Sequence, residues 1–167
     1  MARKTKTLEA AHDVKEFDCG NELLNTWLRQ TASQHVKKKM SQTHCLSKDD
    51  HPDQIAGFYT LALRALTPVT QLPPAMQRRL PDNVPGYTLA RLAVSKEMQG
   101  QGLGAFLLME AIERVLEIAD QIGGAFLFVD AKDAIAARFY AKYGFIPLPS
   151  NPHTLVVSLV TLRKLRA

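Results

Sequence analysis

The sequence predicts an α/β protein in which a mixed β-sheet carries helices on both faces. Three observations support this fold class. Apolar residues recur at helical spacing in three segments, β-branched and aromatic runs separate those segments, and the predicted order is helix, strands, then strand, helix, strand, helix, strand. The 167 residues are 46% hydrophobic and 22% charged, which suits one substantial core, so we expect a single domain over residues 1–167.

The first predicted helix begins near residue 22. Asp18 and Asn21 are both plausible N-cap residues, because a short polar side chain can accept a hydrogen bond from the first turn of a helix. The helix should fade into the lysine run at 37–39. Trp27 is expected in the core. The apolar face consists of Leu23, Leu24, Trp27, Leu28 and Thr31.

Two strands and a long connection follow the first helix. Residues 43–46 and 55–63 predict strands, and the polar residues 47–53 between them predict a hairpin-type loop. Residues 68–86 form a proline-rich connection with room for one short helix over 76–80. Loops of this length in a compact domain are often functional.

The central segment joins a strand to a helix through three glycines at alternate positions. It reads "RLAVSKEMQGQGLGAFLLMEAIERVLEIA" from Arg91 to Ala119, and the strand is expected over 87–94. Gly123 and Gly124 should stop the helix. One apolar stripe marks its buried face: Leu107, Leu108, Ala111, Ile112, Val115, Leu116 and Ala119.

The last part of the chain predicts two strands and a helix. Residues 125–129 form a short buried strand, and Asp133 can cap a helix over 134–143. Gly144 stands at the position after that helix where glycine is common. Residues 154–162 predict the final strand.

The glycine turn predicts a phosphate-binding site. A strand that runs through Gly100, Gly102 and Gly104 into a helix leaves backbone N–H groups unpaired at the positive end of the helix dipole. Glycine suits such a turn because a side chain would block the approach of an anion or forbid a positive φ. The alternative is a tight turn without a ligand, although three alternating glycines exceed what a turn requires.

Three phosphate ligands are compared for this turn. A Walker loop needs a lysine followed by a hydroxyl residue, which the turn lacks, so hydrolysis of a nucleoside triphosphate is not expected. The dinucleotide fingerprint is formally met by Gly100, Gly102 and Ala105, but only one short βα unit follows and Asp120 falls within a helix. The pyrophosphate of coenzyme A is the remaining candidate.

The residues of the turn resemble a known family. "QGQGLG" at residues 99–104 resembles the Q/R-x-x-G-x-G/A motif of the GCN5-related N-acetyltransferases (GNAT). Four blocks, "GFYTLAL", "ARLAVSKEMQGQGLG", "ARFYAKYGFIPLP" and "PHTLVVSL", together resemble the GNAT toxins of bacterial type II toxin–antitoxin modules, the TacT-like or AtaT-like toxins that acetylate aminoacyl-tRNA. The resemblance runs from Phe17 to Leu162, and the blocks stand in family order.

The resemblance implies a GNAT fold, with a mostly antiparallel twisted sheet, flanking helices, and a splayed parallel pair formed by strands 87–94 and 125–129. It implies acetyl-CoA as co-substrate and no metal. Backbone groups around Leu92 and Val94 would pair with the pantetheine arm, and Asp133 stands where many relatives carry a polar residue facing the cofactor. The residues that would wrap the pyrophosphate are Gln99, Gly100, Gln101, Gly102, Leu103, Gly104 and Ala105.

Tyr140 matches the family's catalytic tyrosine in "RFYAKYGF", which implies that its phenol protonates the departing coenzyme A thiolate. Phenol and thiol have reference pKa values of about 10 and about 8.5, so this transfer needs little driving force. The alternative is a core aromatic packed with Phe139 and Tyr143. No general base is evident beside Tyr140, which favours an α-amine, with a reference pKa of about 7.7, over a lysine side chain as acetyl acceptor.

The net charge of +5 and the clustering of positive residues indicate a polyanionic partner. Together with the resemblance, the clusters are interpreted as phosphate contacts to the acceptor stem of tRNA. The alternative is a solvated surface whose lysines complement a helix C-terminus. The candidates are Lys37, Lys38, Lys39, Arg78, Arg79 and Arg91.

Cysteine usage and hydropathy indicate where the protein works. Cys19 and Cys45 follow no metal-ligand or disulfide spacing, and free thiols fit a reducing cytosol. The sequence shows no apolar run long enough to cross a bilayer and no signal-peptide pattern at its start. A cytoplasmic protein without membrane contact is therefore expected.

The resemblance thus implies a toxin that transfers acetyl from acetyl-CoA to the α-amino group of aminoacyl-tRNA and blocks translation. The family further implies a homodimer and a ribbon-helix-helix antitoxin, which neutralises the toxin and binds operator DNA in complex with it, repressing the operon. Two alternatives stay open. One is an N-acetyltransferase for protein N-termini or small amines, and the other is a non-catalytic module that binds coenzyme A.

Overall fold

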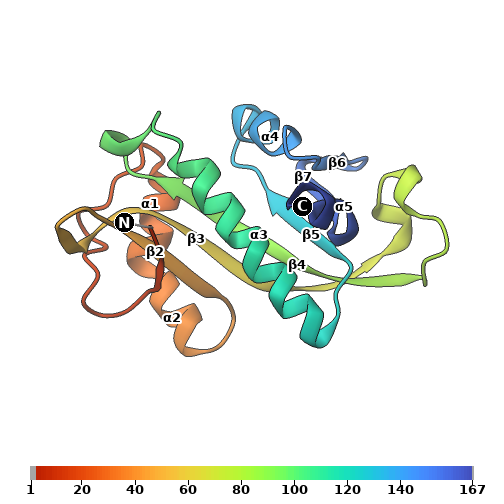
Figure 1. Cartoon of the computed structure of the whole chain (residues 1–167), viewed down its shortest axis with the longest axis horizontal. Helices are drawn as coiled ribbons and strands as arrows, with labels where there is room; N and C mark the ends of the chain where they lie inside the picture. Colours follow the sequence, from red (N-terminus) through yellow and green to blue (C-terminus); the bar gives the residue numbers. More distant parts are fainter. Residues whose placement is uncertain (1–2, 167) are drawn as a thin grey trace. The chain divides into compact units, whose positions relative to one another are not determined.

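The computed structural model describes residues 3–166 (Figure 1). Its seven strands have the order β1-β2-β3-β4-β5-β7-β6. The contacts within the chain define two compact units. Unit 1 comprises the residues up to Ala62 together with Ala90–Ala111, and unit 2 comprises Leu63–Leu89 together with the residues from Ile112 onward. The expectation of one domain over residues 1–167 stays a prediction.

The elements of the chain are as follows. The strands are β1 (Lys6–Thr7), β2 (Gln42–Lys48), β3 (His51–Pro68), β4 (Asn83–Val94), β5 (Phe126–Asp130), β6 (Ile146–Leu148) and β7 (Asn151–Ser158). The α-helices are α1 (Glu22–Gln30), α2 (Ala32–Lys37), α3 (Leu103–Ile122), α4 (Ala134–Ala141) and α5 (Leu159–Arg166). Short 3-10 turns cover Val69–Gln71, Pro74–Met76 and Lys96–Met98.

Unit 1 contains an antiparallel hairpin formed by β2 and β3. Gln42 pairs with Leu61 at the open end, and Asp50 adopts a positive φ of 62° in the turn. The loop is therefore only two residues long, so most of the predicted loop at 47–53 is strand. Alternation places the neighbours Gly57 and Phe58 on opposite faces of β3. An ideal Cβ at Gly57 would lie 2.9 Å from a side-chain carbon of Leu107 in α3, whereas Phe58 packs in the cluster that includes α1.

Helix α1 begins where the sequence predicts. The side chain of Asn21 accepts a hydrogen bond from the Leu24 N–H at 3.1 Å, which confirms Asn21 as the N-cap. Leu24 and Leu28 are buried, while Trp27 is half-buried and stacks on Phe58 with ring centroids 6.3 Å apart. The buried cluster on this face comprises Leu8, Phe17, Cys19, Leu24, Leu28, Ala32, Cys45, Ile55, Phe58 and Ala93.

Unit 2 contains the parallel strand pair that the resemblance implies. β4 pairs with β5 from Gly86 opposite Phe126 to Leu89 opposite Val129, and the pairing ends there although β4 continues to Val94. β7 pairs antiparallel with β5 and with β6. The buried cluster of unit 2 comprises Leu72, Val84, Phe126, Phe128, Leu148 and Val156.

Helix boundaries in the second half of the chain follow the predicted caps. Gly123 and Gly124 end α3 with φ values of 85° and 111°. The side chain of Asp133 accepts from the Ala136 N–H at 2.8 Å, which confirms it as the N-cap of α4. The predicted stripe of α3 is buried from Leu107 to Leu116, and Ala119 is half-buried.

Two predicted elements are wrong. The connection at 68–86 has no helix over 76–80, since its second 3-10 turn ends at Met76 and the Gln77 side-chain amide donates to the Leu72 carbonyl at 2.8 Å. The final strand ends at Ser158, and α5 replaces its predicted end. The Ser158 hydroxyl accepts from the Thr161 N–H at 3.1 Å and so caps that helix.

Candidate functional site

The glycine turn lies in unit 1 between β4 and α3. Gly100 and Gly102 have φ values of 80° and 81°, and an ideal Cβ at either position would meet no atom within 4 Å. The N–H of Phe106 donates to the Gly102 carbonyl at 3.1 Å, so Gly102 immediately precedes the helix. The amides at Leu103, Gly104 and Ala105 therefore have no acceptor within α3. Free amides, open space and the positive end of a helix dipole fit a phosphate group.

Gln99 fixes the turn to the rest of unit 1. Its side-chain amide donates to the carbonyls of Cys19 at 2.9 Å and Val94 at 3.0 Å. The side chain predicted to help wrap a cofactor is thus used for structure, and Gln99 can contribute to ligand binding through its backbone. Leu92 and Val94 are half-buried, and the Val94 carbonyl already accepts from Gln99.

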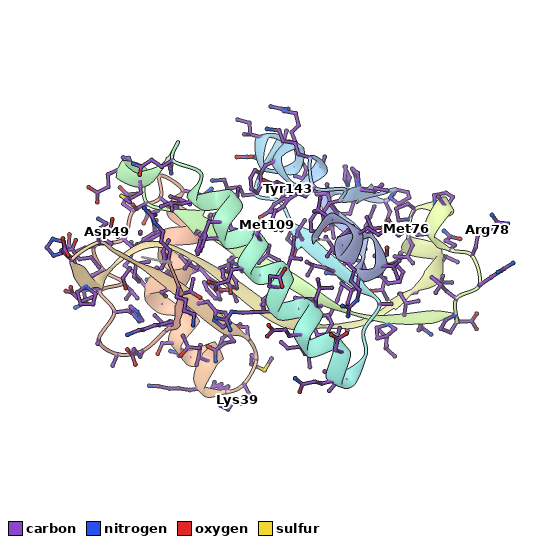
Figure 2. All side chains as sticks on the ribbon, viewed as in Figure 1. Lys39, Asp49, Met76, Arg78, Met109 and Tyr143 are labelled. Atoms are coloured by element: carbon purple, nitrogen blue, oxygen red, sulfur yellow. The ribbon has the colours of Figure 1, made fainter. Side chains whose placement is uncertain are left out.

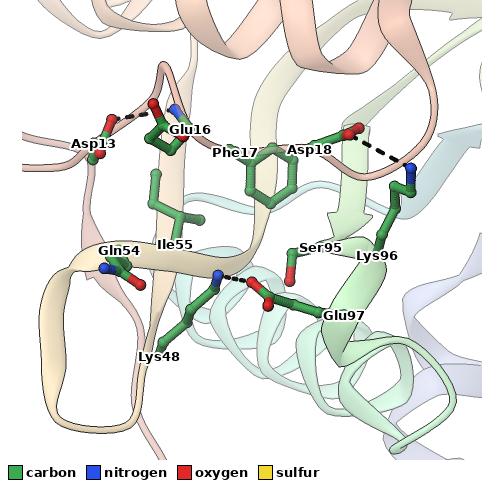
Figure 3. Close-up of a pocket in the computed structure, with 10 residues that line it drawn as sticks. All are labelled: Asp13, Glu16, Phe17, Asp18, Lys48, Gln54, Ile55, Ser95, Lys96 and Glu97. Atoms are coloured by element: carbon green, nitrogen blue, oxygen red, sulfur yellow. Dashed lines mark hydrogen bonds and ion pairs between the residues drawn. The ribbon is translucent and has the colours of Figure 1, made fainter.

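A cavity of about 350 Å³ borders the turn that leads into the glycines (Figure 3). Lys48 at the tip of the β2–β3 hairpin contacts Glu97, and Lys96 lies 3.7 Å from Asp18. The Gly20 N–H and the Asn25 amide also donate to Asp18, which lowers the pKa of its carboxyl. These contacts brace the 3-10 turn at 96–98. Sequence reasoning missed them, because nothing in the local pattern connects Lys48 with Glu97.

Tyr140 lies on α4 in unit 2. Its side chain is 5% exposed, and its ring meets those of Phe139 and Phe145 at centroid distances of 5.3 and 5.8 Å. Burial raises the pKa of the Tyr140 phenol above its ordinary value, and the negative charge of Asp130 raises it further. Tyr140 is therefore a buried aromatic, as the alternative interpretation expected, and also a phenol that stays protonated at neutral pH. Tyr143, the other aromatic of the predicted cluster, contacts Phe139 as well.

Asp133 has a structural role in unit 2. Its carboxylate is the N-cap of α4, and the hydrogen bond to Ala136 engages one of its oxygens. A contact between Asp133 and a cofactor stays a prediction. The residues of the glycine turn, Leu92 and Val94 lie together in unit 1, while Asp133 and Tyr140 lie on α4 in unit 2.

The predicted tRNA contacts fall into two kinds. Lys37–Lys39 are exposed at the end of α2 in unit 1, and Arg78 and Arg79 are exposed between the second 3-10 turn and β4 in unit 2. Figure 2 shows Lys39 and Arg78 at outer turns of the ribbon. Arg91 differs from these residues, because it is half-buried and its guanidinium carbon lies 4.9 Å from the centroid of the Trp27 ring.

Residues 3–166 contain neither a metal-ligand cluster nor a helix suited to crossing a membrane. Within that range, no group of three or more His, Cys, Asp or Glu residues could hold a metal ion. Both cysteines are buried free thiols. No described helix combines the length and the apolar character that crossing a membrane requires.

Comparison with protein families and curated relatives gives a consistent result. Residues 41–147 match the family described as an acetyltransferase (GNAT) domain. A "tRNA-acetylating toxin" of Mycobacterium tuberculosis is 32% identical over 160 residues, which cover 96% of this chain and 94% of the relative.

Solved structures are similar over nearly the whole chain. AtaT complexed with acetyl-methionyl-tRNAfMet has a TM-score of 0.89 at 31% identity, covering 99% of this chain and 100% of that chain. A tyrosine-to-phenylalanine mutant of AtaT, bound to the C-terminus of the antitoxin AtaR and to acetyl-CoA, has a TM-score of 0.83 at 30% identity, covering 99% and 98%. The AtaT–AtaR complex bound to DNA has a TM-score of 0.79 at 29% identity, covering 100% of both chains.

Proposed function

The chain belongs to the GNAT family of acetyltransferases, and on that premise we propose that it transfers the acetyl group of acetyl-CoA to the α-amino group of aminoacyl-tRNA and so blocks translation. The observation that carries this proposal is the similarity over 99% of the chain to AtaT, which was solved with acetyl-methionyl-tRNAfMet. The tRNA-acetylating toxin of M. tuberculosis, at 32% identity, supports the same substrate class.

The glycine turn is the proposed site for the pyrophosphate of acetyl-CoA. The amides from Leu103 to Ala105 would donate to its oxygens, and the positive φ at Gly100 and Gly102 turns the backbone into this position. Bound acetyl-CoA supplies a thioester, which is an activated acyl group. The backbone at Leu92 and Val94 is proposed to hold the pantetheine arm, since both residues precede the turn on the last part of β4.

Tyr140 is the proposed general acid. Its raised pKa keeps a proton on the phenol oxygen throughout the neutral range, as an acid requires. The same shift makes release of that proton costlier than the ordinary pKa of about 10 suggests. Proton transfer from Tyr140 to the thiolate therefore costs more free energy than the reference pKa values predict.

An aminoacyl α-amine suits this reaction because the acceptor must be neutral before it attacks the thioester. Its pKa of about 7.7 leaves much of it neutral at cellular pH, whereas a lysine ε-amine, with a pKa of about 10.4, is almost entirely protonated. The exposed clusters Lys37–Lys39 and Arg78–Arg79 are proposed contacts to tRNA phosphates.

The biological setting follows from the same relatives. We propose that a ribbon-helix-helix antitoxin neutralises the protein and that the complex binds operator DNA, as supported by the AtaT–AtaR structures. We also propose that the chain acts in the cytoplasm, as a homodimer, and as one domain over residues 1–167. The family match at 41–147 includes segments of both units, which supports the single domain.

Mass spectrometry of charged tRNA tests the function directly. Bulk aminoacyl-tRNA is incubated with the protein and acetyl-CoA, and the released amino acids are examined for an added acetyl group. We expect acetylated amino acids with the wild type and little or none with Tyr140→Phe. A panel of small amines and peptide N-termini runs in parallel. Acetylation confined to that panel would replace the tRNA proposal with a general N-acetyltransferase.

A further inference from the structure

Arg91 differs from the other proposed tRNA contacts because its side chain is held in place. Its guanidinium lies over the Trp27 ring, 4.9 Å from the centroid, and one nitrogen donates to the Ala90 carbonyl at 2.9 Å. Trp27 in turn stacks on the fully buried Phe58, with an interplanar angle of 12°. The guanidinium thus rests on a rigid aromatic support that belongs to the core of unit 1.

This guanidinium has no carboxylate partner among residues 3–166. Arg29, Lys48, Lys96 and Arg163 are held in ion pairs, whereas Arg91 is in none within the described part of the chain. Its single hydrogen bond to Ala90 leaves most of its five N–H donors available. A half-buried cation loses hydration that only an anion or another strong acceptor replaces well. The fork of free donors matches the oxygen geometry of a phosphate group.

We propose that Arg91 clamps a phosphate of the acceptor end of tRNA and that Trp27 is a positioning residue that holds Arg91 ready for it. This inference rests on the proposed function and deepens it. It separates one built phosphate contact from the exposed lysines at 37–39, which can supply charge without fixing the position of the substrate.

Arg91 and the glycine turn belong to opposite faces of the sheet, which favours tRNA over coenzyme A as the source of the phosphate that Arg91 binds. Arg91 and Ala93 share one face of β4, and Ala93 packs in the cluster that contains Leu28 and Phe58, on the α1 side. The proposed pyrophosphate site begins α3, whose Leu107 approaches the opposite face at Gly57. A phosphate bound by Arg91 is therefore separate from the one proposed at the glycine turn.

Four variants test the clamp. Arg91→Gln removes the fork, and Trp27→Leu removes its support. Trp27→Phe keeps a smaller ring and tests rescue by a conservative change. Arg29→Gln is the matched control, because Arg29 is also a cation of this region but is paired with Glu22 at 2.7 Å. For each variant we measure kcat and KM for charged tRNA, the salt dependence of tRNA binding by fluorescence anisotropy, and the Kd of acetyl-CoA by calorimetry.

The expected result is a change confined to tRNA. Arg91→Gln should raise the KM for tRNA about tenfold or more, leave kcat within about twofold, and reduce the slope of log affinity against log salt by about one. Trp27→Leu should raise KM roughly three- to tenfold, and Trp27→Phe should recover most of that loss. Arg29→Gln and all acetyl-CoA affinities should stay at the wild-type values. Thermal melting identifies any variant that fails to fold, and Trp27→Phe and Arg91→Gln then still decide the result.

Three results would overturn the clamp. An unchanged KM and salt slope in Arg91→Gln would mean that Arg91 contacts no tRNA phosphate. A weaker affinity for acetyl-CoA with normal tRNA binding would assign the phosphate to coenzyme A. Equal losses in Trp27→Leu and Trp27→Phe would remove the positioning role. Failure of the proposed function is distinct, because a wild type that binds tRNA with an Arg91-dependent salt slope but acetylates no aminoacyl-tRNA would refute the activity and retain the clamp.

Discussion

At the scale of single residues, Tyr140 is a buried aromatic and also the proposed acid, which the sequence presented as alternatives. Its ring packs against Phe139 and Phe145, and this burial raises the pKa of its phenol further above neutrality. A buried aromatic position is therefore compatible with acid chemistry. Motif resemblance identified the residue, while its raised pKa depends on packing and on Asp130, which local sequence does not reveal.

Replacing Tyr140 with phenylalanine removes the proton and keeps the ring. We expect kcat to fall by roughly a hundredfold or more, as is typical for loss of a general acid, with an unchanged Kd for acetyl-CoA. Single-turnover acetylation of charged tRNA measures the effect. Tyr143→Phe is the matched control, since Tyr143 follows the same helix and packs against Phe139. Comparable activity of the Tyr140 variant and the wild type would reject the acid role.

The buried thiol of Cys45 should make the free energy of unfolding fall as the pH becomes alkaline. Desolvation raises the pKa of its thiol to about 12, so the folded protein holds this proton longer than the unfolded chain does. The sign follows: the contribution to stability is complete below the unfolded pKa of about 8.5 and is lost as pH rises toward 12. The free energy of unfolding should fall by up to about 1.4 kcal/mol per pH unit in that window from this group alone.

Urea unfolding between pH 8 and pH 11 measures this alkaline dependence. Cys45→Ala removes the ionisable group and should give a shallower fall than the wild type does. The substitution also shortens a buried side chain and lowers stability at every pH, so the slope and not the absolute value carries the test. Identical slopes in the two proteins would contradict the assignment.

At the scale of elements, the glycine turn can be tested with an internal control. Gly102 and Gly123 have nearly the same φ, 81° and 85°, and an ideal Cβ at either meets nothing within 4 Å. Alanine should therefore cost a similar amount of stability at both positions, about 1 kcal/mol of backbone strain. Only Gly102→Ala should also weaken the binding of acetyl-CoA, by about tenfold, because it alters the proposed pyrophosphate site. Calorimetry and urea unfolding of both variants measure the two effects, and equal affinities would exclude a role for the turn in binding.

Elements with a local signal were predicted well. Asn21 and Asp133 carry their capping information in the residues themselves, so α1 and α4 begin at the predicted positions. The end of α4 differs from the prediction, because the helix ends at Ala141 with Lys142 as its C-cap, two residues before Gly144.

Val160 and Thr161 favour strands, so local preference extends the final strand through residues 159–162. Leu159 and Leu162, however, are buried at helical spacing, and Ser158 caps the helix. Local preference gives strand and helix similar free energies for these residues, and burial in the folded chain selects the helix.

The candidate site was predicted in part for the same reason. The glycine positions and the following helix are local features, and the structure has them as expected. The hydrogen bond of Gln99 to Cys19 joins residues 80 positions apart, and the contact of Lys48 with Glu97 joins residues 49 positions apart. The support of Arg91 by Trp27 likewise joins elements distant in the chain. Such pairs depend on the assembled unit, and no spacing rule predicts them.

At the scale of the whole molecule, the net charge of +5 should govern how strongly tRNA binds. Replacing Lys37, Lys38 and Lys39 together with glutamine should weaken tRNA binding at low salt and reduce the salt slope by up to about three if all three neutralise phosphates. The double change at Arg78 and Arg79 should reduce it by up to about two. Lys15→Gln, at an exposed lysine with no proposed role, is the control. Slopes that match the control would leave both clusters as solvated surface.

The path of the chain through its two units has a consequence for biosynthesis. The boundaries at 62, 89 and 111 fall within β3, β4 and α3, and unit 1 is complete in sequence once residue 111 has been added. Helix α4 with Tyr140 contacts β7, which residues 151–158 form. A nascent chain can thus form its glycine turn before residues 151–158 have been added, whereas α4 lacks its packing against β7 until then. The proposed anion site would therefore precede the proposed acid during synthesis, and the nascent enzyme would stay inactive until β7 is in place.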